Sequence, residues 1–311
     1  MEHQNNVTEF ILLGLSNDPQ LKIFLFLLFL VIYLFTLVGN MMIMVAIRTN
    51  SQLNTPMYFF LFYLSFLDVF YSSVILPKML ENFLSRRQTI SFHGCFAQIF
   101  LIILSGCTEG FMLSAMASDR LAAICDPLHY MNIMNWRVCS QLVASAWTMS
   151  FLLGLVNTLF LLNVHFCGPN EVNHFSCELP SLLALSCTET VTNELVLLTS
   201  VVIFALSSFV PILVSYICII STILRIRSAE GRRKAFSTCS SHLTVVGLLY
   251  LTALGQYMKP SAASSVVLNK LFSVQYSILT PFLNPIIYSL KNKDMKMALR
   301  KIYSSHSINV H

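Results

Sequence analysis

The residues of this sequence best able to do chemistry are charged groups inside or beside long apolar runs. Only 11% of the 311 residues are charged. Asp68 and Glu109 each fall within a run that carries no other charge, and Asp119 and Arg120 directly follow the second of these runs. A charge inside hydrocarbon is costly, and such residues are usually functional when a protein retains them. We therefore expect these four residues to form functional sites.

The two acids within the runs predict one of two arrangements. Asp68 and Glu109 can share a cation such as sodium, with Asn284 as a further oxygen ligand, because hard cations take oxygen ligands. Alternatively, one or both carboxyl groups are protonated and form a neutral pair. Both arrangements require the two side chains to face inward and to lie near each other. The sequence leaves the choice open, and we expect no other cofactor.

The elements that must position these groups are membrane helices. Hydrophobic residues make up 56% of the chain, which is not the composition of a soluble domain. A helix needs about 20 apolar residues to cross the hydrocarbon core. Seven such runs occur, and they predict an all-α membrane protein with a seven-transmembrane helix bundle: 23–47, 57–76, 95–118, 138–164, 195–224, 235–258 and 271–290.

Basic residues predict how the bundle is oriented. With seven crossings the two ends lie on opposite sides, and the side with more Lys and Arg is cytoplasmic. The amino-terminal side holds 6 of the 19 basic residues and the opposite side holds 13. We therefore expect a cell-membrane protein with an extracellular N-terminus and a cytoplasmic C-terminus. Asn6 begins an N-glycosylation triplet on the expected outer side. The net charge of +5 indicates contact with membrane lipids and no nucleic acid.

The chain divides into three parts around this bundle. Residues 1–22 form an outer tail without the pattern of a cleaved signal peptide, and residues 23–290 form the membrane domain. That domain includes a long outer loop at 164–194. Residues 291–311 form a cytoplasmic tail, in which apolar residues recur at helical spacing among basic ones from Lys291 to Tyr303. This pattern predicts a short amphipathic helix on the inner membrane surface. A frayed basic tail is the alternative.

Four of the nine cysteines fall on the expected outer side: Cys95, Cys167, Cys177 and Cys187. Thiols oxidise outside the cell, so we expect two disulfides. Four cysteines allow three pairings. Their spacing favours Cys95 with Cys177, which ties the long loop to the third run, and Cys167 with Cys187, which closes the loop on itself.

Other classes of site are weaker interpretations. His165 and His174 lie near the outer cysteines and offer a metal site, but oxidised cysteines are poor ligands. The sequence contains no glycine-rich phosphate loop and no nucleophile pattern, so we expect no enzyme. A transporter is disfavoured by the odd number of spans, by the lack of repeated halves and by the scarcity of polar residues.

Several motifs, in order, resemble the odorant receptors of the rhodopsin-like G-protein-coupled receptor superfamily, specifically the tetrapod-type class II group. The resemblance extends from Asn6 to about Arg300. It rests on these segments: LNTPMYFFL at 53–61, LSFLDVFYSSVILPKML at 64–80, MASDRLAAIC at 116–125, PLHY at 127–130, KAFSTCSSHL at 234–243 and PFLNPIIYSLKN at 281–292. The segment at 234–243 resembles this family and not other seven-helix receptors.

The resemblance implies a receptor that binds a small volatile odorant and activates a heterotrimeric olfactory stimulatory G protein, which raises cAMP. A receptor for a metabolite outside the nose is the alternative. The family pattern implies the same disulfide pairing, and it matches Asp68 and Glu109 to a buried acidic pair. It also implies a G-protein switch made of Asp119, Arg120, Tyr216, Tyr250, Asn284 and Tyr288.

The sequence departs from the family pattern beside this switch. Ser118 and Leu121 stand where relatives usually have tyrosines, Leu249 and Leu251 flank Tyr250 in place of the usual residues, and Asn54 replaces a common histidine. These changes affect the expected coupling strength and basal activity, and they leave the expected fold unchanged.

The expected ligand site lies between the outer halves of spans three, five, six and seven. No acid lies on the relevant face of span three, which disfavours a cationic amine, and Ile278 stands where a retinal-binding protein needs lysine. The expected lining is apolar with a few hydroxyl groups and suits a small, mostly neutral, lipophilic molecule. Its residues are Ile102, Ile103, Gly106, Cys107, Ser200, Ile203, Phe204, Ala253, Leu254, Tyr257, Val274 and Ser277.

Overall fold

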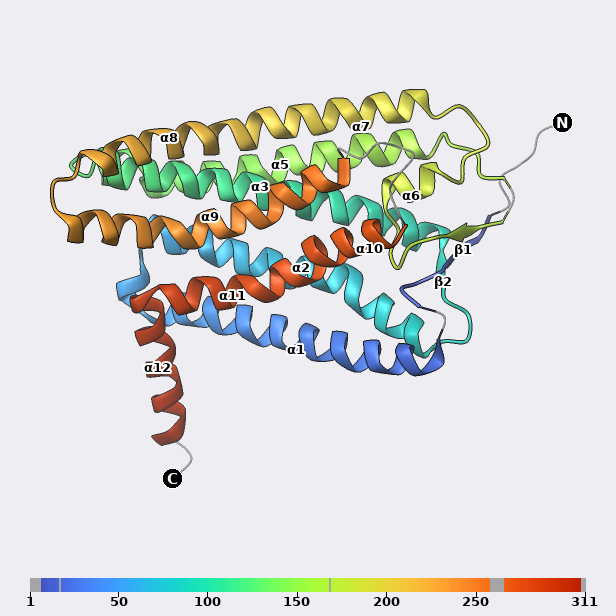
Figure 1. The fold of residues 1–311 in the computed structure, drawn as a ribbon, viewed down its shortest axis with the longest axis horizontal. Coiled ribbons are helices and arrows are strands. Elements are labelled where there is room, and N and C mark those ends of the chain that lie inside the picture. Colours follow the sequence, from blue (N-terminus) through green and yellow to red (C-terminus); the bar gives the residue numbers. More distant parts are fainter. Residues whose placement is uncertain (1–6, 17, 168, 258–265, 309–311) are drawn as a thin grey trace.

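The computed structural model describes residues 7–16, 18–167, 169–257 and 266–308. Seven helical segments form one bundle (Figure 1). They are α1 (Pro19–Thr49), α2 (Pro56–Leu84), α3 (Phe92–Cys125), α5 (Trp136–Leu161), α7 (Val191–Phe204) continuing through η2 (Ala205–Phe209) into α8 (Val210–Arg225), α9 (Ala229–Tyr257), and α10 (Val266–Val274) continuing through η3 (Gln275–Leu279) into α11 (Thr280–Lys291).

The predicted seven-helix membrane bundle is confirmed. Within the described residues, five helical stretches are long and apolar enough to cross a membrane, and a shorter apolar stretch, Cys239–Gly255, lies in α9. The segment α10–η3–α11 completes the bundle. Several helices extend past the apolar runs: α2 reaches Leu84 and α9 begins at Ala229. Hydropathy locates the part of a helix in hydrocarbon, whereas hydrogen bonding continues into the polar region beyond it.

Local sequence signals explain where the helices begin. Before α1, α3 and α5, the side chains of Asp18, Ser91 and Asn135 each accept a hydrogen bond from a first-turn backbone N–H at 3.0–3.1 Å. Such caps satisfy groups that have no partner within the helix. Helix α2 begins with Pro56, whose missing N–H costs nothing at that position.

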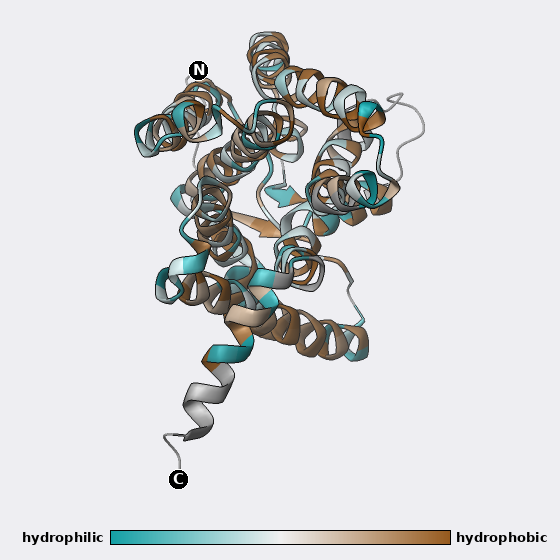
Figure 2. Cartoon of the chain, turned by 90° about the vertical axis from the view of Figure 1, so that its left-hand side faces the viewer, coloured by the Kyte–Doolittle hydropathy of each residue, from teal (hydrophilic) through white to brown (hydrophobic). Residues whose placement is uncertain are grey.

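Burial differs among the helices as a membrane bundle requires. The most apolar stretch of α3 is 61% buried, whereas those of α1 and of the α7–α8 segment are each 11% buried. Helix α3 is therefore central, and the outer helices expose Leu, Ile, Val and Phe side chains along their length. Figure 2 shows the bundle from the end where α12 leaves it, and apolar colouring dominates the helices. This surface suits lipid.

Two π turns interrupt the spans at the prolines. η2 ends just before Pro211 and η3 ends just before Pro281. Proline lacks an N–H and its ring collides with the carbonyl one turn earlier, so a wider turn relieves the contact. Helix α1 packs closely on the following segment: Asn40 donates to the Pro281 carbonyl at 3.2 Å, and a Cβ on Gly39 would lie 3.2 Å from Pro285.

One end of the bundle, here called the outer end, carries a small sheet in the order β2-β1-β3 that the sequence does not predict. β1 (Glu9–Leu12) pairs antiparallel with β2 (Thr89–Ser91) and parallel with β3 (Glu171–Val172). The long loop at 164–194 also contains α6 (Leu179–Leu183). Phe10, in β1, is fully buried. Residues 9–12 are thus part of the folded outer end.

The opposite end, here called the inner end, carries short connecting helices and the predicted amphipathic helix. η1 (Ser51–Leu53) joins α1 to α2, and α4 (Tyr130–Ile133) lies between α3 and α5. α12 (Lys293–Ile308) runs crosswise to the bundle in Figure 1 and continues past the predicted end at Tyr303. Met295 and Ala298 are buried on its inward face, which matches its apolar spacing.

Candidate functional site

A partly buried hydrogen bond fixes Asp119 at the inner end of α3. The Tyr130 phenol, on α4, donates to Asp119 Oδ1 at 2.7 Å, and the Asp119 side chain is almost fully buried. Burial, followed by the nearby Asp119 carboxyl group, raises the pKa of Tyr130 above its usual value, so its hydroxyl stays protonated and donates. Tyr130 belongs to the PLHY segment at 127–130, but the sequence alone gives it no role. The partner that the structure gives Asp119 is thus a neighbouring phenol.

Arg120 points in a different direction from Asp119. Its guanidinium contacts the sulfur of Met57, at the beginning of α2. It also lies close enough to Tyr216 and Tyr288 for its charge to act on both. The side chain is half-buried, and a guanidinium without a paired carboxylate is available for a new partner.

His242 joins three spans near this arginine. Its Nε2 lies 3.0 Å from the Leu113 carbonyl on α3, and its Nδ1 lies 2.7 Å from the Tyr216 hydroxyl on α8. A carbonyl can only accept, so in the neutral ring Nε2 carries the hydrogen and Nδ1 accepts from Tyr216. His242 belongs to α9 and is buried. Sequence reasoning missed its role, although it is the histidine of the segment at 234–243.

Tyr250 and Phe204 form an aromatic contact between α9 and α7. The Tyr250 hydroxyl donates to Ser208 in η2 at 2.8 Å, and the Tyr250 and Phe204 rings are stacked with centroids 6.3 Å apart. The Phe204 ring lies against Gly110, where a Cβ would collide with it. The absence of a side chain on Gly110 therefore allows α7 to approach α3 here. Tyr288 is buried on α11, and its hydroxyl has no hydrogen-bond partner among the described residues.

The structure brings the two acids together with Asn284. Asn284 Nδ2 donates to both Asp68 oxygens, at 3.0 and 3.1 Å, and its side chain also interacts with Glu109. All three residues are at most 2% exposed. Among the described residues, Glu109 Oε1 and Asn284 Oδ1 have no hydrogen-bond partner. Unpartnered oxygens beside two carboxyl groups fit either a bound cation or a shared proton.

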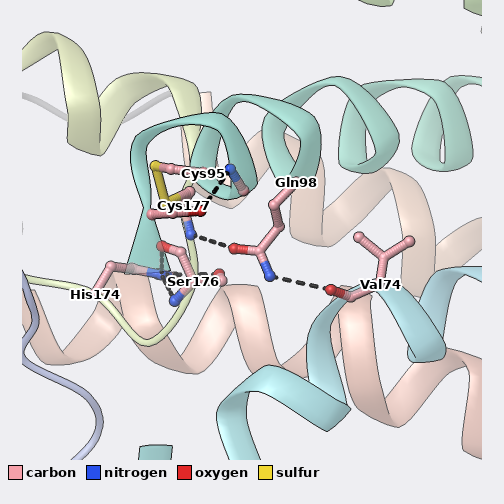
Figure 3. The surroundings of a disulfide bond; sticks show 8 residues. Val74, Cys95, Gln98, His174, Ser176 and Cys177 are labelled. Carbon is pink, nitrogen blue, oxygen red and sulfur yellow. Dashed lines mark hydrogen bonds between the residues drawn. A yellow bond between two sulfur atoms is a disulfide. The ribbon is translucent and has the colours of Figure 1, made fainter. Parts of the chain in front are cut away.

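The outer loop is tied to the bundle through Cys177. Disulfides join Cys95 to Cys177 and Cys167 to Cys187, which is the pairing that the spacing favours. Figure 3 shows Gln98 beside the first of them, between the loop and α2. Its Oε1 accepts from the Cys177 backbone N–H at 2.8 Å, and its Nε2 donates to the Val74 carbonyl at 3.0 Å. One buried amide thus positions the loop relative to two helices.

A second contact ties the same loop to the start of the seventh span. His174 is 2% exposed, and its Nε2 lies 3.2 Å from the Ser273 hydroxyl on α10. Glu178 accepts from the Tyr276 hydroxyl at 2.8 Å. Within the described residues, no group of three His, Cys, Asp or Glu side chains is arranged to hold a metal. His174 therefore lies in a hydrogen-bonded loop contact.

Comparison with known proteins identifies the family. A family model described as olfactory receptor matches residues 29–306. Human olfactory receptor 5M10 is 49% identical, with 97% of this chain and 96% of that protein covered. Human olfactory receptor 10A6 is 48% identical and rat olfactory receptor 1f45 is 46% identical, with at least 96% of each chain covered. The chain belongs to the olfactory receptor family. It is a multi-pass membrane receptor that functions in olfaction.

The expected ligand residues of this olfactory receptor lie in several different environments. Ile102, Ile103, Phe204 and Val274 are partly buried against apolar clusters. Gly106 adjoins open space, since an added Cβ would meet no atom within 4 Å. The remaining described members are partly buried (Cys107, Ser200, Ala253), exposed (Ile203, Leu254) or fully buried (Ser277). The side chain of Tyr257, and the proposed glycosylation site Asn6, lie outside the described residues.

The two serine hydroxyl groups expected to meet the ligand already have partners. Ser200 accepts from Asn157 on α5 at 2.8 Å, and Ser277 donates to the Ser273 carbonyl at 2.5 Å. Two cavities among the described residues lie elsewhere, one at the inner end and a very small one beneath the outer strands. Sequence pattern identifies the helix faces but does not determine which hydroxyls are free, because that depends on the neighbouring helix.

Proposed function

We propose that this receptor binds a small, mostly neutral, lipophilic odorant within the outer half of the bundle and activates a heterotrimeric G protein at its inner end. The inner end is cytoplasmic and the amino terminus extracellular in this proposal. The bias of basic residues towards the inner side supports the orientation. Activation of the olfactory stimulatory G protein then raises cAMP.

One observation carries the proposal. His242 joins α3, α8 and α9 through hydrogen bonds to Leu113 and Tyr216, and it lies close enough to Arg120 for the arginine's charge to act on it. Outward movement of α8 and α9 breaks both bonds, frees the Tyr216 hydroxyl and opens the inner face around Arg120. A ligand drives this change only by binding the open state more tightly than the closed state.

The expected ligand class follows from the side chains between the outer halves of the spans. Space beside Gly106, the Phe204 ring and the apolar side chains of α3 and α10 favour dispersion contacts. The nearest buried acid, Glu109, already interacts with Asn284. A neutral ligand with at most one or two hydrogen bonds fits this environment better than a cation.

The buried acids support regulation by sodium or by a shared proton. Asp68, Glu109 and Asn284 would hold a sodium ion through carboxylate and amide oxygens, and the ion would neutralise the pair. Without an ion, a proton shared between the carboxyl groups does the same. Either occupant stabilises the closed bundle by removing like-charge repulsion at its centre.

The experiment is a cAMP assay in cells that supply the olfactory stimulatory G protein. A broad panel of neutral odorants should contain at least one that raises cAMP. Arg120→Ala should reduce that response to background with surface expression retained. Arg137→Ala removes an exposed arginine from the same end and should leave the response unchanged. Full responses from the Arg120 variant, or none from the native receptor at the surface, would contradict the proposal.

A further inference from the structure

A groove at the inner end of the bundle lies outside the switch residues. It lies between the end of α1, the turn η1, the beginning of α2 and the beginning of α5, with a cavity volume of about 500 Å³. Ligand sites of proteins commonly have about 300–1,000 Å³. Neither Arg120 nor any other expected switch residue lines this groove.

The wall of the groove on the bundle side is aromatic. Phe59 contacts Tyr63 and Trp136 edge to face, with centroids 5.0 and 5.7 Å apart, and Phe62 contacts Tyr63 at 5.7 Å. Trp136 is 42% exposed at the first residue of α5. Tryptophan and tyrosine at helix ends are typical of the boundary between hydrocarbon and headgroups. This wall therefore fits the part of a lipid acyl chain that lies next to the glycerol.

The rim of the groove is cationic and polar. The Arg48 guanidinium lies 4.9 Å from the Phe62 ring centroid, which holds the charge at the edge of the aromatic wall. Asn50, Ser51, Asn54 and Thr55 complete the rim, and no acidic residue lines it. Thr55 precedes α2 without a side-chain cap, so the positive helix end also faces this region. The Arg48 charge and the positive end of α2 both favour a negative group at the rim.

The arrangement of the two parts matches one kind of molecule. A cationic rim next to an aromatic wall at a membrane boundary requires an anionic headgroup attached to an apolar chain. The leaflet on the side richer in basic residues carries anionic phospholipids, which attract basic residues near the surface. A sterol would use the aromatic wall but leave Arg48 without an anion, and a free anion would leave the wall unused.

We propose that this groove is a binding site for an anionic glycerophospholipid, with the phosphate at Arg48 and the upper acyl chain against Phe59, Tyr63 and Trp136. The lipid bridges the inner ends of α1, α2 and α5. It holds the first turn of α2, and with it Met57, in place beside Arg120. The site depends on the orientation proposed above only for which leaflet supplies the lipid.

The test uses the purified full-length receptor in phosphatidylcholine nanodiscs that contain a small fraction of phosphatidylserine with a photoactivatable acyl chain. Peptide mapping after irradiation should locate the label on segments 47–63 and 136–142. Unlabelled phosphatidylserine should compete, whereas phosphatidylcholine, cholesterol and inorganic phosphate should not. Arg48→Gln should lower the labelling about fivefold, which is the contribution expected of one arginine beside an anionic headgroup.

Matched variants separate a site from general surface charge. Arg137→Gln removes one positive charge close to Trp136 but outside the groove, and it should label like the native receptor. Arg48→Lys keeps the charge and should retain most of the labelling, which also controls for folding. Equal loss in Arg48→Gln and Arg137→Gln, competition by cholesterol or phosphate instead of phosphatidylserine, or label spread evenly over the spans would each overturn the proposal. None of these readouts depends on an odorant or a G protein.

Discussion

The hydrogen bond between Tyr130 and Asp119 contributes to the free energy of unfolding, and this contribution can be measured. Asp119 is 1% exposed, and the phenol of Tyr130 approaches it from a short helix outside the spans. Removing one partner leaves a buried carboxyl group unsatisfied, which costs more than the bond itself contributes. The pair therefore couples the connecting segment after α3 to the position of Asp119.

A double-mutant cycle tests this coupling. Tyr130→Phe should lower the free energy of unfolding by about 1.5–3 kcal/mol, the usual range for a hydrogen bond to a charged group. In the Asp119→Asn background the same change should cost at least about 1 kcal/mol less, because the two residues interact directly. Denaturant unfolding in mixed micelles gives the four values. Equal costs in both backgrounds would show that Tyr130 acts elsewhere.

Individual residues differ in how far their roles follow from the sequence. Asp68, Glu109 and Asn284 were expected to meet because an isolated charge in hydrocarbon has few alternatives. The structure places them together. Tyr130 and His242 could not be assigned partners in advance. A phenol or an imidazole is tolerated in many environments, and its partner depends on how α3, α4, α8 and α9 pack.

At the scale of elements, the two disulfides constrain different lengths of chain. Cys95 and Cys177 are separated by 82 residues and join α3 to the loop, whereas Cys167 and Cys187 are separated by 20 and lie within the loop. In the chain-entropy model a crosslink stabilises more when it closes a longer segment. Gln98 adds hydrogen bonds beside the first disulfide, and the Cys187 backbone N–H donates to the His165 carbonyl at 3.1 Å beside the second.

Removing each disulfide by a paired Cys→Ser replacement should therefore have unequal effects. Loss of Cys95–Cys177 should cost about 4.5 kcal/mol and loss of Cys167–Cys187 about 3 kcal/mol. Thermal unfolding of the purified receptor and the fraction reaching the cell surface both report the order. A larger loss from the loop disulfide would mean that the loop, and not its attachment to α3, determines stability of the outer end.

The length of an element explains whether the sequence predicts it. Seven spans follow from composition because hydrocarbon demands about 20 apolar residues and a complete set of backbone hydrogen bonds from every crossing. The outer strands are only 2–4 residues long, and β1 finds its partners at residues 89–91 and 171–172. Segments this short carry no usable periodicity, so their pairing depends on the disulfide-linked loop and the bundle beneath it.

At the scale of the whole molecule, the buried residues form separate clusters at the two ends. One cluster contains Phe10, Leu12, Ile90 and the outer cysteines Cys95 and Cys177. Another surrounds the inner parts of α2, α3, α8 and α9 and includes Tyr216, Tyr250 and Tyr288. The amino-terminal strand closes the first cluster without touching the second. We therefore expect that the apolar cores at the two ends can be perturbed independently.

Phe10→Ala provides a direct test of this independence. Phe10 is fully buried. Its ring stacks on that of Phe92, with centroids 6.0 Å apart, and contacts the Phe166 ring edge to face, with centroids 5.5 Å apart. Truncating a buried phenylalanine usually costs about 3–5 kcal/mol. The loss should appear as faster amide hydrogen exchange in residues 9–14, 89–92 and 166–187, because the sheet that Phe10 supports opens more often.

Exchange in the inner half of the bundle should remain unchanged, since no residue around His242 and Tyr216 lies in the outer cluster. The matched control is Phe35→Ala, which removes the same side chain from a position on α1 that is 64% exposed towards lipid. It should leave exchange at the outer end as it is. If Phe10→Ala instead accelerates exchange across α8 and α9, the two ends unfold as one unit, and a change in the outer sheet reaches the residues around His242 through stability alone.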